Sequence, residues 1–148
     1  MIDAAAGLAV FAGATEGRVP AGLVNAGLIE HPASGAPVFA HVAYGDSHRV
    51  ARLAKRPECS ITVHDGRRWL TVEGRAELVH GPWDERSAAD APELRLGEDR
   101  YAELLRTIYR AAGGGEHPDW PGFDATMRTE RRVVVMAGLD RLYGIHWD

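Results

Sequence analysis

This sequence has almost no cysteine, no long apolar run and no excess of positive charge. The single cysteine, Cys59, excludes an internal disulfide and any metal site built from several cysteines. No apolar run approaches the ~20 residues of a membrane-spanning helix, so we expect no membrane partner. Residues 1–6 lack the basic flank of a secretory signal, which predicts a cytoplasmic protein.

The net charge of −4 argues against a general nucleic-acid binder. One basic stretch stands out, residues 48–56, which contains four Arg or Lys residues and no Asp or Glu. The length of 148 residues, with 45% hydrophobic and 26% charged residues, is that of an ordinary globular protein. We therefore predict one domain over residues 1–148.

The common catalytic and metal-binding motifs are also missing. The seven histidines are scattered without the spacing of a metal site, so no metal is expected. No nucleophile elbow, P-loop or dinucleotide-binding glycine motif is present. Cys59 lies in a β-branched segment without an adjacent base, which indicates a buried structural thiol. These observations name no catalytic residue.

Short apolar segments separated by turn residues predict strands over most of the chain. The expected strands cover 7–13, 19–29, 37–44, 59–64, 68–79 and 131–145. Apolar residues at helical spacing predict helices over 47–55 and 100–112, with another short one over 119–130. Residues 83–100 are charged and have no regular pattern.

Six strands separated by turn residues in this way predict a mainly β protein, which we expect to form a six-stranded antiparallel barrel. A short helix follows its third strand, and a helical insert precedes its last one. Closure removes the exposed edges of a sheet. Because side chains fill the interior of such a small barrel, a sizeable ligand has to bind outside it, between subunits.

The turn Tyr44-Gly45-Asp46-Ser47-His48-Arg49 leads from a strand into a helix. A helix N-terminus presents free N–H groups, which suit a phosphate, and Ser47 and Arg49 add further donors. The same pattern also fits an ordinary Ser47 cap with a solvated basic helix face.

Two residues of the fifth strand have alternative interpretations. The ring of Trp69 could cover a planar ligand, or it could pack in the core or at a dimer interface. Glu73 could act as a general base, or it could pair with Arg68 or Arg75.

Taken in order, several segments of this chain resemble the pyridoxamine 5′-phosphate oxidase-like split β-barrel superfamily. Within it, the chain is similar to the oxidoreductases that use coenzyme F420, a deazaflavin. The segments that carry the resemblance are 23–27, 47–49, 52–57, 68–78, 116–120, 130–135 and 141–144.

The resemblance implies an FMN-binding-like split barrel that forms a homodimer with cofactor sites at the subunit interface. Flavin-binding relatives bind the cofactor phosphate with a Ser-Arg-Lys run, which corresponds here to Ser47-His48-Arg49. They also carry a Gln at the position of Trp69, whereas many deazaflavin relatives have a Trp there, as this chain does. These departures favour coenzyme F420 over FMN. Such relatives begin with a helix, whereas this sequence starts almost at the first strand.

The resemblance thus predicts a reductase that passes hydride from the reduced deazaflavin to a conjugated small molecule, such as an enone, a quinone or a tetrapyrrole. The alternatives are an FMN-dependent oxidase or reductase, and a non-catalytic carrier of flavin, deazaflavin or haem. The expected cofactor-binding residues are Asn25, Tyr44, Gly45, Ser47, His48, Arg49, Arg52, Lys55 and Trp69.

Overall fold

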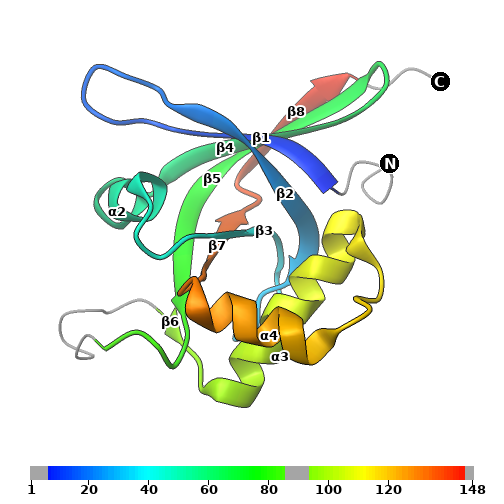
Figure 1. Ribbon diagram of the computed structural model, residues 1–148. Coiled ribbons are helices and arrows are strands. Elements are labelled where there is room, and N and C mark those ends of the chain that lie inside the picture. Colours follow the sequence, from blue (N-terminus) through cyan, green and yellow to red (C-terminus); the bar gives the residue numbers. More distant parts are fainter. Residues whose placement is uncertain (1–6, 86–93, 146–148) are drawn as a thin grey trace.

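A computed structural model describes residues 7–85 and 94–145 of the chain, which are mainly β-structure (Figure 1). The expectations for residues 1–6 and for 86–93 within the irregular stretch lie outside the described residues. The strands are β1 (Gly7–Gly13), β2 (Ala21–Glu30), β3 (Pro37–Ala43), β4 (Glu58–Asp65), β5 (Arg68–His80), β6 (Leu94–Arg95), β7 (Val133–Gly138) and β8 (Arg141–Ile145).

Six of these strands close into a barrel in the order β4-β1-β2-β3-β7-β5, with β5 pairing back to β4. All pairs around the barrel are antiparallel. The predicted six-stranded antiparallel barrel is therefore confirmed. Two further strands lie outside this ring, because the two-residue β6 runs parallel to β5 and β8 pairs with β5.

The sequence predicts one last strand over 131–145, and this prediction is wrong. The chain forms two strands there, which pair with different halves of β5. They diverge beside Gly74, where a Cβ would collide with the carbonyl oxygen of Gly138. Past this crossing the N–H of Asp140 donates to the carbonyl of Glu73 at 3.2 Å. The missing side chain lets two backbones cross, and β8 then follows the β4–β5 hairpin away from the barrel (Figure 1).

Two apolar clusters lie on opposite faces of the barrel wall. Alternation along β7 places Val133, Val135 and Ala137 inside the barrel, whereas Val134 and Met136 pack outward beneath the helices. Phe11, Phe39 and Ile61 fill much of the interior, and all three are at most 2% exposed. This packing leaves the outer surface of the wall for a sizeable ligand.

Three α-helices cover the outside of the barrel in the described part of the chain: α2 (His48–Lys55), α3 (Glu98–Tyr109) and α4 (Trp120–Thr129). A wider π-helical turn, η1 (Arg110–Gly114), continues α3 and ends where Gly113 adopts φ 89°. The predicted helices over 47–55, 100–112 and 119–130 thus match helical segments. None of the described helices is long and apolar enough to cross a membrane.

His41 lies in the barrel interior and is 2% exposed. Its ring centroid lies 4.7 Å from that of Phe11, and its Nε2 atom has no hydrogen-bond partner among the described residues. Burial, together with the charge of Arg49, lowers the pKa of His41 from 6.5 to about 3. The folded protein therefore keeps this imidazole neutral over a range in which the unfolded chain protonates it.

This difference predicts acid sensitivity. Between pH 6.5 and about 3, His41 binds a proton in the unfolded state but not in the folded state. The free energy of unfolding therefore falls as the pH falls. His41→Phe should flatten this dependence by up to ~1.4 kcal/mol per pH unit, measured by urea unfolding across that range. The exposed His64→Phe control should keep the wild-type slope. Equal slopes for wild type and His41→Phe would contradict the assignment.

Candidate functional site

A cavity of about 960 Å³ lies between the outer barrel wall and the helical layer. The start of β2, the end of β3 and the turn into α2 line one side, while α3, η1 and α4 line the other. The lining residues used below are Asn25, Tyr44, Ser47, Arg49 and Arg52 on the barrel side, and Leu105, Ile108, Tyr109, Phe123 and Met127 on the helical side.

The barrel side of this cavity is cationic. Arg49 and Arg52 both line it, and no Asp or Glu belongs to the described lining. Neither arginine forms an ion pair within residues 7–85 and 94–145, and the Nε of Arg52 is buried without a hydrogen-bond partner. Partial burial, followed by the charge of Arg52, lowers the pKa of the Arg49 guanidinium. An anionic ligand would relieve both the unmade hydrogen bond and the repulsion.

Local packing sets the position of Arg49. Its guanidinium carbon lies 5.6 Å from the centre of the Phe11 ring, at cation–π distance. A Cβ at Gly22 would come within 3.1 Å of its Nη2 atom, so the glycine leaves room for the guanidinium. Strand β2 and the core residue Phe11 therefore hold this cation at the cavity wall.

Ser47 joins the arginines at the start of α2. Its Oγ accepts a hydrogen bond from the N–H of Val50 at 3.3 Å, which caps the helix. The hydroxyl hydrogen remains available to donate to a ligand. The cap and the anion-binding interpretation of Ser47 are thus compatible.

Arg132 is a third lining arginine, but it already has partners. Its Nε donates to Glu130 at 2.8 Å, and its guanidinium stacks 3.8 Å from the centre of the Tyr44 ring. This neutralised arginine orients Tyr44, which stays 50% exposed at the cavity. The unpaired positive charge of the described lining thus rests on Arg49 and Arg52.

The structure brings five of the nine predicted cofactor-binding residues to one cavity, and these are Asn25, Tyr44, Ser47, Arg49 and Arg52. The other four do not line it. Gly45 packs against the Arg131 carbonyl, with which a Cβ would collide. His48 and Lys55 are exposed at opposite ends of α2.

Trp69 lies on the β4–β5 hairpin, outside this cavity. It pairs with His64 of β4 and Ile145 of β8, and its ring meets Tyr143 edge to face at 6.3 Å. The two arginines that the sequence suggested as partners of Glu73 are wrong, since Arg68 and Arg75 pair with Asp65 and Glu58, whereas Glu73 pairs with Arg141 at 4.0 Å. Glu73 also accepts a hydrogen bond from Tyr143 at 3.2 Å, because β8 lies next to it.

Sequence reasoning named no residue on the helical side of the cavity. The apolar face of residues 100–112, which includes Leu105, Ile108 and Tyr109, has the pattern of an ordinary core-facing helix. The same face packs on the barrel at one end and lines the cavity at the other. Periodicity identifies the face that is covered, but it does not separate a side chain that meets protein from one that meets a ligand.

No family model matches this sequence. Solved structures with the same fold do exist. The conserved hypothetical protein Rv2991 from Mycobacterium tuberculosis aligns with a TM-score of 0.69 and 16% identity, over 99% of this chain and 80% of that one. A protein described as an F420 reductase aligns with a TM-score of 0.60 and 13% identity, over 96% and 93% of the two chains.

A putative pyridoxamine 5′-phosphate oxidase from Listeria innocua also aligns, with a TM-score of 0.51 and 11% identity, over 93% and 87% of the two chains. This chain has their split-barrel fold. The fold that the resemblance implied is therefore confirmed, while identities this low leave function to be argued from the site itself.

The cationic side of the cavity predicts that the protein binds inorganic phosphate. Arg49→Ala should weaken phosphate binding by ~1.5–3 kcal/mol, the contribution of a charged hydrogen bond, measured by isothermal titration calorimetry at low salt. Arg75→Ala is the matched control, because Arg75 is exposed, pairs with Glu58 and lies outside this cavity. An Arg49→Ala variant that binds phosphate as wild type does would remove Arg49 from the site.

Proposed function

We propose that this protein is a reductase that uses reduced coenzyme F420 as a two-electron donor toward a conjugated small molecule. The observation that carries the proposal is a pair of arginines, Arg49 and Arg52, beside Ser47 in a cavity of about 960 Å³. Neither arginine has a carboxylate partner among the described residues. Ligand cavities of this kind measure ~300–1,000 Å³, so the volume suits a phosphate-bearing cofactor. The likeness in fold to an F420 reductase supports the same assignment.

The donor set fits the cofactor at its anionic part. Arg49 and Ser47 would hold the phosphate, and the buried Nε of Arg52 gains the partner that it lacks within the described residues. His48 and Lys55, exposed on α2, would meet the acidic tail outside the cavity. Asn25 and Tyr44 would line the sheet side of the ring system. The bound deazaflavin supplies the hydride chemistry, and the protein supplies orientation and charge.

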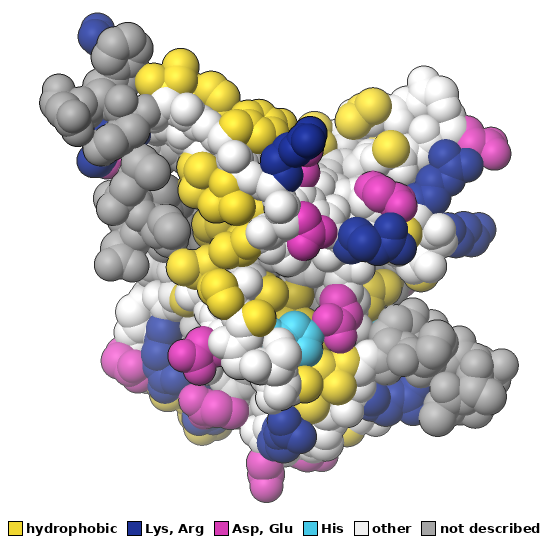
Figure 2. All heavy atoms as spheres, turned by 180° about the vertical axis from the view of Figure 1, so that it is seen from behind, with side chains coloured by type: hydrophobic (Ala, Val, Ile, Leu, Met, Phe, Trp, Pro, Cys, Tyr) yellow, Lys and Arg dark blue, Asp and Glu magenta, His cyan; other side chains and the backbone are white. Residues whose placement is uncertain are grey.

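The cavity opens next to an unusually apolar outer surface. Leu23 lines the cavity and is 65% exposed, and it pairs with Val10 of β1, which is 41% exposed. A further band of hydrophobic side chains lies on the face turned away from the viewer in Figure 1, as Figure 2 shows. Large exposed apolar surface indicates an interface, so a second copy of the chain would complete the site. Trp69 of that copy is our candidate to pack near the ring system.

Cofactor choice is tested by titration of the purified protein. We expect coenzyme F420 to bind with a change in its fluorescence and FMN to bind more weakly, since the run Ser47-His48-Arg49 departs from the Ser-Arg-Lys run of the flavin-binding relatives. Steady oxidation of the reduced cofactor by a quinone, followed by absorbance, would identify a reductase. Tight FMN binding without F420 binding would overturn the proposal, and tight F420 binding without turnover across enones, quinones and tetrapyrroles would indicate a carrier.

The dimer has its own test. Val10→Asp places a charge on the apolar outer surface and outside the cavity lining, so it should produce a monomer. We expect light scattering to report a dimer for wild type and a monomer for the variant, and the monomer to bind the cofactor more weakly. A wild-type protein that is monomeric at every concentration would contradict the two-subunit site.

A further inference from the structure

The helical side of the cavity carries a packed group of aromatic rings that the proposed cofactor contacts do not use. Tyr109 and Phe123 line the cavity, and both contact Trp120 behind them. The centroids of Tyr109 and Phe123 are 5.3 Å apart, and each lies within 5.6 Å of Trp120. Rings at these distances and steep angles form favourable edge-to-face pairs, so the wall is aromatic and ordered.

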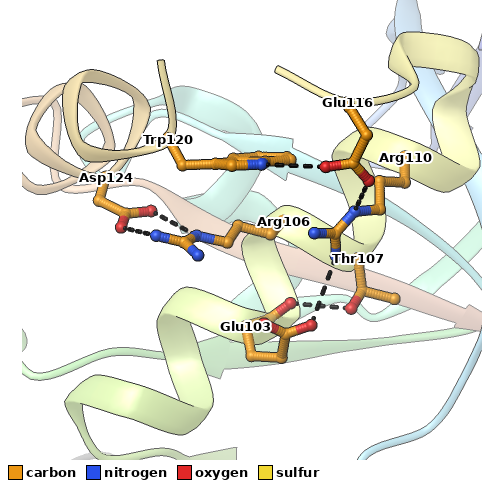
Figure 3. A network of polar contacts seen from close by, with 7 residues as sticks. All are labelled: Glu103, Arg106, Thr107, Arg110, Glu116, Trp120 and Asp124. Carbon is orange, nitrogen blue, oxygen red and sulfur yellow. Dashed lines mark hydrogen bonds and ion pairs between the residues drawn. The ribbon is translucent and has the colours of Figure 1, made fainter. Parts of the chain in front are cut away.

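Charged side chains lie against Trp120 and fix its position. Arg106 and Arg110 lie against its ring at 5.2 and 4.8 Å from the centroid (Figure 3). Asp124 holds Arg106 through two hydrogen bonds, of 3.1 and 2.5 Å. Glu116 accepts hydrogen bonds from both Arg110, at 2.8 Å, and the indole N–H of Trp120, at 3.1 Å. The network thus fixes a ring that does not itself line the cavity.

The other side of Tyr109 is fixed by a glycine. A Cβ at Gly114 would lie 2.5 Å from the Cε1 atom of Tyr109, so the backbone of η1 packs directly on the ring. In residues 7–85 and 94–145 the Tyr109 hydroxyl has no hydrogen-bond partner, although it belongs to a lining residue. The ring is therefore held by Gly114, His117, Trp120 and Phe123, and its cavity-facing surface is left for a ligand.

The two sides of the cavity differ sharply in chemistry. The barrel side holds the unpaired cations, whereas the helical side adds Leu105, Ile108 and Met127 to the two rings. None of the described lining residues of α3, η1 and α4 is charged. A single anionic ligand would satisfy only the first side. The helical side suits a flat, uncharged ring, because aromatic side chains make favourable edge-to-face and stacked contacts with planar rings.

We propose that Tyr109 and Phe123 form the binding wall for the planar ring of the electron acceptor, and that Trp120 is a positioning residue that holds this wall in place. The proposal rests on the proposed function for calling the bound ring an acceptor. The ring preference itself depends on the wall alone.

The preference is tested with redox-inert probes and without cofactor. Naphthol and its fully saturated counterpart, decahydronaphthol, have similar size but differ in planarity. Calorimetry on the full-length protein should give naphthol the tighter binding by about fivefold, a typical gain from aromatic pairing. Tyr109→Leu should bring the ratio of the two dissociation constants close to one, whereas Tyr109→Phe, which keeps the ring, should retain the wild-type ratio.

The positioning role of Trp120 needs a measurement that a general loss of stability does not move. Trp120→Leu should lower the preference for naphthol over decahydronaphthol, and Trp120→Phe, which keeps a ring beside the two arginines, should retain it. The ratio compares two ligands on one protein, so a lower melting temperature alone leaves it unchanged. In the assay with reduced cofactor, Trp120→Leu should raise KM for a quinone more than it lowers kcat.

Equal binding of the two probes to wild type, or a ratio that Tyr109→Leu leaves intact, would overturn the inference. Displacement of naphthol by coenzyme F420 would also overturn it, because the wall would then hold the cofactor ring. Failure of the proposed function has a different signature, in which naphthol binds with the expected ratio but coenzyme F420 does not bind.

Discussion

Side chains fill the interior of the barrel, and the rest of the molecule is arranged around that constraint. Six strands close on themselves, and Phe11, Phe39 and Ile61 occupy the space that closure creates. The outer face of the same wall must then bury its own apolar residues, and α3 covers Val134 and Met136 there. A cavity remains where the helices part from the wall, between β2, the turn into α2 and the helical insert. The cavity thus lies between the outer face of the closed barrel and the helices that pack on it.

The electrostatics of the cavity follow from the same arrangement. The acidic residues of the chain outnumber the basic ones, yet none of the described cavity-lining residues is acidic. Elsewhere most described arginines have carboxylate partners, as in the network around Trp120. Arg49 lies instead beside Phe11, whose ring packs against the buried, neutral His41. Partly buried cations without counterions are costly for a folded protein, and a bound anion offsets that cost.

Local patterns identified much of the structure. Apolar alternation and turn residues located the six barrel strands, and Ser47 was recognised as the start of α2 because a side-chain cap is a local interaction. The same reasoning treated 131–145 as one strand and passed over Gly138 and Asp140, which lie where β7 ends and before β8 begins. The crossing is set by Gly74, which lies far away in sequence and has no Cβ to obstruct Gly138. Glu73 was assigned the wrong partner for the same reason, because β8 arrives beside it from the distant end of the chain.

The sequence by itself determined most of the strands, the helical segments and the basic turn at Ser47 and Arg49, because each depends on residues within a few positions of one another. Only the tertiary structure decided that Asn25, Tyr44 and Arg52 share a cavity with that turn, and that Trp69 lies on another part of the molecule. It also decided that Tyr109 and Phe123 face the cations across the cavity. Periodicity specifies which side of a helix is covered, whereas what covers it depends on how distant segments pack.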